Sequence, residues 1–80
     1  MTFEDLQEIL AEQFSCTVED LTEDTDLFDD LGADELDITE LAWNVGEGIG
    51  EEVSDEELQS CRTVGQLWQL IQELEQDAGL

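Results

Sequence analysis

The imbalance between acidic and basic side chains limits this sequence to folds that spread carboxylates over their surface. Its 80 residues contain 24 Asp and Glu side chains and a single basic one, Arg62, which gives a formal net charge of −23. Repulsion among the carboxylates opposes compaction and keeps molecules apart. We therefore expect a monomer whose free energy of unfolding is small at low ionic strength and rises with added salt or divalent cations.

The same charge narrows the classes of partner. An acidic surface repels the phosphates of nucleic acids and of anionic membranes, so we expect neither as a partner. It favours a basic patch on another protein. A general solubility surface and adaptation to a salty cytoplasm are alternative explanations, and composition alone does not separate them from docking.

The N-terminal segment and the cysteines are typical of a cytoplasmic protein. The first ten residues lack the basic region and the apolar run of a signal peptide. The longest uncharged run, residues 63–72, is too short to span a bilayer. Cys16 and Cys61 form no CxxC motif, and no histidine is present to activate a thiolate. We expect two buried, reduced thiols, with a disulfide as the less favoured alternative.

Apolar residues at helical spacing predict long helices at both ends of the chain. Thr2 and Asp5 form a capping box at the start of the first helix, and Thr63 and Gln66 form another at the start of the last. The first apolar stripe consists of Phe3, Leu6, Ile9, Leu10 and Phe14. The last consists of Val64, Leu67, Leu70, Ile71 and Leu74, with Trp68 expected at the edge of the core.

Between these helices lie a long connection and a short helix. Residues 15–34 predict an ordered loop, because apolar residues recur along it as anchors: Val18, Leu21, Leu27, Phe28 and Leu31. Residues 55–61 predict a short helix capped by Ser54 or Asp55, with Leu58 and Cys61 facing inward. No segment shows the sustained alternation of a strand. We expect a single domain over 1–80, an all-α four-helix bundle with a long first loop and a short third helix.

The segment "ADELD" predicts the start of the second helix. Asp34 is a good N-cap, Asp37 occupies the third helical position, and their charges suit the positive end of the helix dipole. The apolar face consists of Ile38, Leu41, Ala42, Val45 and Ile49. Glycines at 46, 48 and 50 each disfavour a helix by about 1 kcal/mol relative to alanine, so we expect fraying or an early end there.

A second stripe along this helix places apolar residues among carboxylates. It consists of Leu36, Glu40, Trp43 and Glu47, at positions i, i+4, i+7 and i+11. Leu36 and Trp43 suit the apolar anchors of a protein-docking surface, and Asp37, Glu40 and Glu47 suit charges that steer a partner. The alternative is that Trp43 lies flat on a neighbouring loop.

The sequence shows no clear motif for a metal centre or for an active site. The run "EDTDLFDD" fails as an EF-hand loop, because counting from Asp24 places Asp29 where the central glycine belongs. Asp24, Asp26, Asp29 and Asp30 are weak candidates for a partly hydrated Ca²⁺ or Mg²⁺ site, and a solvated acidic loop is preferred. Histidine and tyrosine are absent and no nucleophile–base constellation is found, so we do not expect an enzyme.

The stretch "DLGADELD", residues 30–37, resembles the acyl carrier proteins and the related peptidyl carrier domains, which typically have DLGADSLD there. The resemblance extends over nearly the whole chain, through "EILAEQF", "EEVSDEEL" and "RTVGQLWQLI". It implies a four-helix bundle that docks through its second helix on basic patches of synthases and transferases. The docking positions that it implies correspond to Leu36, Glu40, Trp43 and Glu47.

One residue departs from the family pattern. The resemblance implies a serine at position 35, flanked by Asp34 and Leu36, that receives 4′-phosphopantetheine. Glu35 has no hydroxyl, so no cofactor is expected unless the natural protein has serine there. We expect a carrier-like module that acts through docking. Two alternatives stay open: a genuine acyl or peptidyl carrier of fatty-acid or polyketide-type synthesis whose serine was substituted at 35, and an acidic divalent-cation-binding protein.

Overall fold

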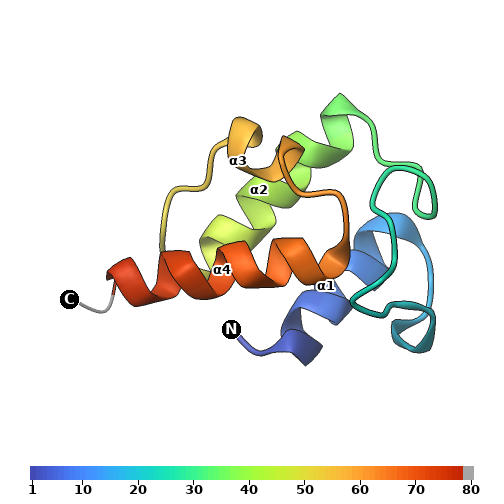
Figure 1. Cartoon of the computed structure of the whole chain (residues 1–80), viewed down its shortest axis with the longest axis horizontal. Helices are drawn as coiled ribbons and strands as arrows, with labels where there is room; N and C mark the ends of the chain where they lie inside the picture. Colours follow the sequence, from blue (N-terminus) through green and yellow to red (C-terminus); the bar gives the residue numbers. More distant parts are fainter. Residues whose placement is uncertain (79–80) are drawn as a thin grey trace.

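The structure is a computed structural model that describes residues 1–78, which fold into four α-helices joined by ordered loops (Figure 1). The α-helices are α1 (Phe3–Phe14), α2 (Glu35–Ile49), α3 (Asp55–Gln59) and α4 (Val64–Ala78). One 3₁₀ turn, η1 (Val18–Asp20), lies in the long first loop. The described residues form no strand, only an isolated bridge between Asp26 and Thr63. The predicted all-α bundle with a long first loop and a short third helix is confirmed.

Short polar side chains at the helix starts explain why the helices begin where they do. At each of the four starts, an N-cap side chain accepts a backbone N–H three residues on, and that residue's side chain accepts the N-cap N–H in return. The pairs are Thr2–Asp5, Asp34–Asp37, Ser54–Glu57 and Thr63–Gln66. Three of these caps confirm sequence predictions, and the fourth selects Ser54 over Asp55.

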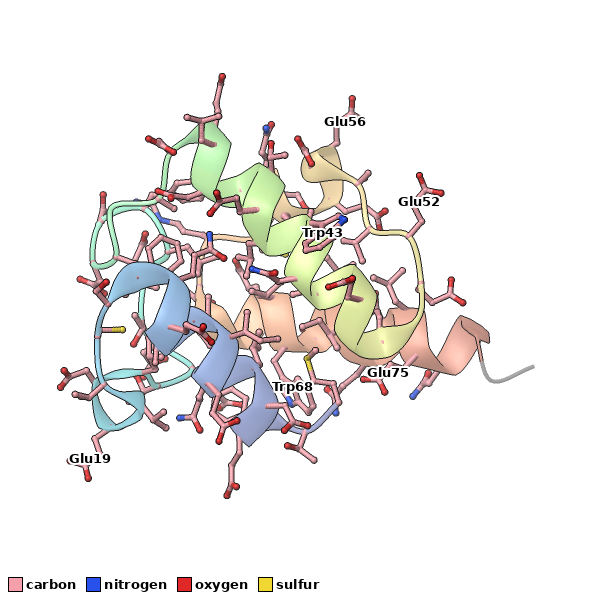
Figure 2. The ribbon with its side chains drawn as sticks, turned by 180° about the vertical axis from the view of Figure 1, so that it is seen from behind. Glu19, Trp43, Glu52, Glu56, Trp68 and Glu75 are labelled. Carbon is pink, nitrogen blue, oxygen red and sulfur yellow. The ribbon has the colours of Figure 1, made fainter. Side chains whose placement is uncertain are left out.

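The carboxylates lie around the outside of the bundle, as the charge of the sequence requires. Figure 2 shows the labelled Glu19, Glu52, Glu56 and Glu75 on different sides of the molecule. No Asp or Glu is among the fully buried side chains of the described residues, where the only buried polar residue is Thr25. Within residues 1–78, no helix has both the length and the apolar run needed to cross a bilayer.

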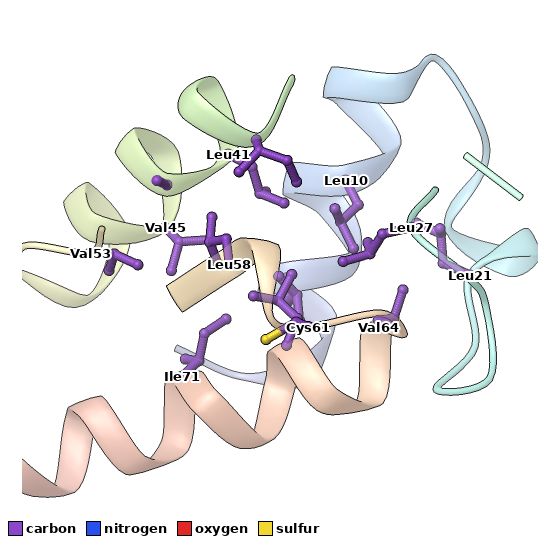
Figure 3. Packing of buried hydrophobic residues seen from close by; sticks show 14 residues of the cluster. Leu10, Leu21, Leu27, Leu41, Val45, Val53, Leu58, Cys61, Val64 and Ile71 are labelled. Atoms are coloured by element: carbon purple, nitrogen blue, oxygen red, sulfur yellow. The ribbon is translucent and has the colours of Figure 1, made fainter. Parts of the chain in front are cut away.

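An aliphatic core lies between the helices (Figure 3). It is built from the predicted inner faces of α1, α2 and α4, together with residues of the loops and of α3. Its members are Leu6, Leu10, Leu21, Leu27, Ile38, Leu41, Ala42, Val45, Val53, Leu58, Cys61, Val64, Leu67 and Ile71. Burying one leucine or isoleucine contributes about 1.5–3 kcal/mol, so this layer supplies the main force opposing the repulsion of the surface charges.

Several residues of the predicted inner stripes and anchors pack against the core but are only partly buried: Phe3, Ile9, Phe14, Phe28, Leu31, Ile49, Leu70 and Leu74. Val18 and Cys16 also lie closer to solvent than expected. Val18 is 37% exposed, because it begins the η1 turn and only Leu21, just beyond that turn, enters the core. Cys16 is half-buried, because it follows Ser15, whose left-handed conformation (φ 56°) turns the chain away from α1. Both cysteines are free thiols. Burial raises the pKa of the Cys61 thiol, which donates a hydrogen bond to the backbone oxygen of Glu57.

The expectation that α2 frays at its glycines is wrong. The helix continues through Gly46 and Gly48 to Ile49, and Gly50 ends it with a left-handed φ of 73°. The backbone N–H groups of Gly50 and Glu51 both donate to the oxygen of Gly46, at 2.8 and 3.1 Å. A Cβ at residue 46 would lie 2.7 Å from the backbone oxygen of Glu51, so only glycine allows the next loop to pack this closely.

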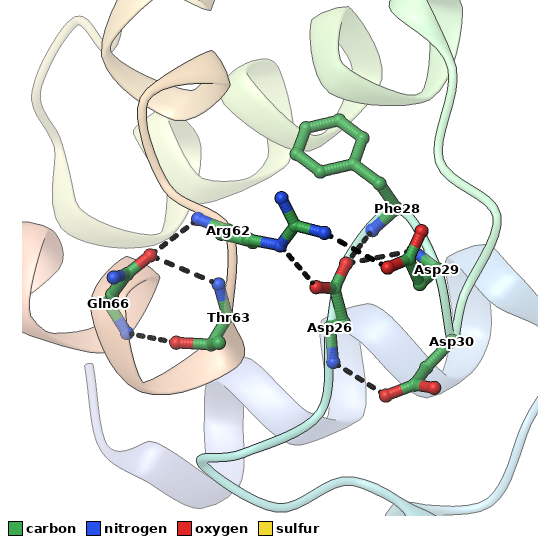
Figure 4. Close-up of polar contacts among 7 residues, drawn as sticks. All are labelled: Asp26, Phe28, Asp29, Asp30, Arg62, Thr63 and Gln66. Carbon is green, nitrogen blue, oxygen red and sulfur yellow. Dashed lines mark hydrogen bonds and ion pairs between the residues drawn. The ribbon is translucent and has the colours of Figure 1, made fainter.

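Arg62 holds the long first loop against the start of α4 (Figure 4). Its guanidinium contacts Asp26 Oδ2 at 2.8 Å and Asp29 Oδ2 at 3.0 Å. Backbone hydrogen bonds join the same segments, from the Leu27 N–H to the Arg62 oxygen and from the Val64 N–H to the Thr25 oxygen. The loop is therefore fixed on both sides of Asp26, which sets the path by which the chain enters α2.

Candidate functional site

The start of α2 is built by backbone and capping contacts that do not involve the side chain of residue 35. The chain turns at Gly32 (φ 71°), and the Ala33 N–H donates to the Leu27 oxygen at 3.0 Å. The Asp37 N–H then donates to Asp34 Oδ1 at 2.9 Å, and the Asp34 N–H donates to Asp37 Oδ2 at 3.1 Å. These contacts place the first helical residue at an exposed corner of the fold.

Glu35 occupies this first helical position and is exposed to solvent. No hydrogen-bond partner for its carboxylate is found within residues 1–78. Its charge lies at the positive end of the α2 dipole, a favourable place for an anion. Because the turn and the cap do not use this side chain, another residue at position 35 would be presented at the same place.

Thr39, one turn further along, is the nearest hydroxyl on the helix, and it is already engaged. Its Oγ1 lies 2.7 Å from Asp55 Oδ2 and 3.1 Å from the backbone oxygen of Glu35. The single hydroxyl proton goes to the nearer, charged acceptor. This bond ties α2 to the start of α3, so the hydroxyl has a structural partner.

The outer stripe predicted on α2 is exposed along its whole length. Leu36 is 76% exposed and Trp43 is 66% exposed, and Glu40 and Glu47 are exposed beside them. The alternative that Trp43 lies flat on a neighbouring loop is therefore wrong. Asp37 differs from the other predicted steering charges, since it is half-buried and accepts the Asp34 N–H.

The two tryptophans lie in contrasting surroundings. Figure 2 shows Trp43 on the outer side of α2 and Trp68 on α4, close to the start of α1. The Trp68 ring meets the Phe3 ring edge to face, with centroids 5.8 Å apart. Trp68 thus packs at the edge of the core as predicted, whereas most of the Trp43 side chain is exposed to solvent.

Sequence reasoning missed a groove beside Trp43. A hollow of about 430 Å³ lies between α2 and the loop that joins α2 to α3. Its lining consists of Thr39, Ala42, Trp43, Gly46, Glu47, Gly50, Glu51, Glu52, Val53 and Asp55. The spacing of Gly46 and Gly50 was the available signal, because it is typical of a helix end against which the following loop packs.

The acidic loop does not gather its carboxylates around a cation site. Asp26 and Asp29 are paired with Arg62, and Asp30 accepts the Asp26 N–H at 2.8 Å. The backbone N–H of Asp29 and the Arg62 guanidinium lower the pKa of Asp26, against the opposing effect of burial. Asp24 is exposed, and no cluster of three possible metal ligands occurs in the part of the chain that the structure describes. Three of the four candidates therefore bind Arg62 or the backbone of the loop, and Asp24 faces solvent.

Comparison with known proteins assigns the chain to a family. Residues 4–76 match the family model described as a phosphopantetheine attachment site. An acyl carrier protein of Saccharopolyspora erythraea is 38% identical over 72 residues, covering 90% of this chain and 76% of the relative. The chain therefore belongs to the acyl-carrier-like family of phosphopantetheine-attachment domains.

Family membership confirms one expectation from the sequence. Acyl carrier proteins are carriers and not catalysts, so this chain is not an enzyme. The prosthetic group of the family is 4′-phosphopantetheine.

Proposed function

We propose that this protein is an acyl-carrier-like module that bears no phosphopantetheine and acts by docking the outer face of α2 on a basic protein surface. The observation that carries the proposal is the exposed stripe with Leu36 and Trp43, which begins next to Glu35, at the position where the resemblance implies a modified serine. The chain thus presents a surface suited to recognition, while its exposed corner lacks a hydroxyl.

The residues at the start of α2 do not fit the prosthetic group of the family. Attachment joins the arm to a side-chain hydroxyl as a phosphodiester. A carboxylate has no hydroxyl, and a phosphate on the Glu35 carboxyl would form a reactive mixed anhydride in place of a stable ester. The Thr39 hydroxyl is one helical turn away, and it donates a hydrogen bond to the Asp55 carboxylate. We infer that the arm has no attachment point in this chain.

Docking on a basic surface uses both kinds of residue in the stripe. Burial of an exposed tryptophan or leucine contributes about 1.5–3 kcal/mol each, which is enough to anchor a small interface. Glu40 and Glu47 lie on the same stripe and accelerate the approach of a positively charged partner. We expect a monomeric chain to bind one such partner, because self-association would bring two strongly acidic surfaces together.

Intact mass spectrometry after incubation with a phosphopantetheinyl transferase and CoA tests the missing attachment. We expect the mass of the full chain to stay unchanged. Glu35→Ser is the matched control and should gain one arm, because the Gly32 turn and the Asp34–Asp37 cap would present the new hydroxyl at the same corner. A gain of mass by the unaltered chain would reject the proposal.

Affinity capture from native lysate tests docking separately. We expect the chain to retain a synthase- or transferase-type partner and Trp43→Ala to retain much less of it. Trp43→Ala should keep the helix content of the parent, because the ring lies outside the core. Equal retention by the parent and the variant would show that the stripe is ordinary surface.

A genuine acyl or peptidyl carrier is the second candidate. The intact turn and cap around position 35 favour it, since they would suit a serine as well as they suit Glu35. The natural gene provides the test. A serine codon at position 35 would support this candidate, and a glutamate codon would support the docking module.

A further inference from the structure

The hollow beside Trp43, here called the Trp43 groove, combines an apolar lining with an acidic edge. Ala42 and Val53 are buried members of its lining. Glu47, Glu51 and Glu52 line it too, and all three are exposed to solvent. A ligand that fills the groove therefore meets aliphatic groups along its length and carboxylates at the opening.

The groove is held open by backbone contacts. The Glu51 oxygen packs against Gly46, and Gly50 turns the chain so that Val53 returns to the core. Thr39 and Asp55, which also line the groove, are joined by a hydrogen bond of 2.7 Å. These contacts preform the site, so binding requires little ordering of the chain.

Trp43 lines a second hollow as well as this groove. The second hollow, of about 460 Å³, is lined by Thr39, Glu40, Trp43 and Asn44. Glu40 and Glu47 flank Trp43 on the same stripe, three residues before it and four after it, and each lines one of the two hollows with it. An exposed indole with carboxylates nearby on its helix attracts a cation through the ring quadrupole as well as through ion pairs.

We propose, on the basis of the docking function above, that the Trp43 groove receives an arginine side chain of the partner protein. The aliphatic stem would pack against Ala42 and Val53, and the guanidinium would stack on Trp43 and donate to the carboxylates at the opening. Arginine suits this arrangement better than lysine, because its planar head stacks on aromatic rings and is less strongly hydrated.

A second copy of this chain does not supply that arginine. Arg62 is the single basic side chain in the sequence, and it is already paired with Asp26 and Asp29. A partner of different sequence is therefore required. Its basic surface must present at least one arginine that projects far enough to enter the groove.

Paired synthetic peptides test the preference for arginine. Both peptides share one amphipathic sequence, and they differ only in having arginine or lysine at every basic position. Titration into the full chain, followed by nuclear magnetic resonance, should give roughly two- to fivefold tighter binding of the arginine peptide. The Trp43 indole N–H and the amides of Gly46 and Gly50 should shift most.

Variants of the chain distinguish the contribution of the groove to binding from the contribution of the overall negative charge. Trp43→Leu keeps an apolar side chain without an aromatic face and should bind both peptides equally. Glu47→Gln with Glu52→Gln removes two charges at the groove and should weaken binding of the arginine peptide. Glu4→Gln with Glu19→Gln removes two charges elsewhere, on α1 and η1, and should change binding much less.

The outcomes distinguish this proposal from the proposed function. Equal affinities of the two peptides for the unaltered chain would overturn the proposal that the groove binds arginine. An arginine preference that survives in Trp43→Leu would also overturn it. The proposal would also be overturned if both pairs of glutamine substitutions weakened binding equally, because the charge of the whole chain would then explain the binding. None of these results alters the transferase experiment, which alone decides whether an arm is attached.

Discussion

The two connections that flank α2 are held in place by different kinds of contact. The long loop before the helix depends on an ionic contact from Arg62 to Asp26 and Asp29, together with backbone hydrogen bonds. The loop after the helix depends on close backbone packing at Gly46 and a left-handed turn at Gly50. One connection should therefore respond to salt and pH, whereas the other should respond mainly to side-chain size.

The candidate site has two parts, the corner at position 35 and the Trp43 groove, and each depends on a different one of these loops. The salt-sensitive loop leads to Glu35 and determines how the start of α2 is presented. The sterically packed loop forms one side of the Trp43 groove. Changes in ionic strength should therefore alter the geometry of the corner at position 35 before they alter the shape of the Trp43 groove.

Gly46→Ala should have the largest effect, and it acts on the packed loop. The new Cβ would lie 2.7 Å from the Glu51 oxygen, so the loop has to move. We expect a loss of about 1–3 kcal/mol in the free energy of unfolding, even though alanine favours helix. Urea denaturation measures it. Gly48→Ala is the matched control, because its Cβ would meet only the flexible end of Met1, and an equal loss in both variants would contradict this account.

Arg62→Gln should have a smaller effect that depends on salt. It removes both ion pairs and leaves the Asp26 and Asp29 carboxylates facing each other without a cation. The unfolding midpoint should fall at low ionic strength, and the difference from the parent should narrow as NaCl screens the charges. Thermal unfolding at several salt concentrations measures this. A difference that stays constant across those concentrations would mean that the pairs are not the cause.

Asp26→Asn should remove a stabilising contribution that depends on pH. The pKa of Asp26 is lowered in the folded protein, so its charged form stabilises the fold above the ordinary value of 3.8. That contribution is lost as the pH falls through the lower, folded pKa. The stability difference between parent and variant should therefore shrink below about pH 4. Parallel acid titrations of the parent and the variant measure this, and a stability difference that stays constant from about pH 7 down through pH 4 would contradict it.

Trp43→Ala should have the smallest effect on stability. A side chain that is 66% exposed contributes little to the core, so the free energy of unfolding should change by no more than about 0.5 kcal/mol. Binding to a basic partner should nevertheless weaken by about 2 kcal/mol, as is typical of aromatic anchors. Urea denaturation and calorimetric titration measure the two quantities. A large loss of stability would place Trp43 in the core and remove its docking role.

Local chemistry explains why much of the fold could be predicted from the sequence. The pairs Thr2–Asp5 and Asp34–Asp37 lie three residues apart, so the chain itself brings them together. The inner and outer stripes of α2 follow from helical geometry alone. The exposed positions of Leu36 and Trp43 were predictable for the same reason.

Contacts that depend on tertiary structure were harder to predict. Arg62 and Asp26 are 36 residues apart, and nothing local to either of them predicts their pairing. Val18 has the apolar character of an anchor, but the direction of the η1 turn leaves it exposed. The glycines of α2 have low helix propensity, and the close packing of the next loop at Gly46 overrides it. The Trp43 groove was missed because that packing creates it.

The cap that Asp34 and Asp37 complete between themselves has a consequence for evolution. Since each carboxylate accepts the backbone N–H of the other residue, the side chain at position 35, the first residue of α2, makes no contact that the fold requires. Under the proposed function, a substitution there would change what can be joined to the protein and would leave the Trp43 groove unchanged. Cargo and recognition would then be under separate selection, so that a lineage could lose one and keep the other.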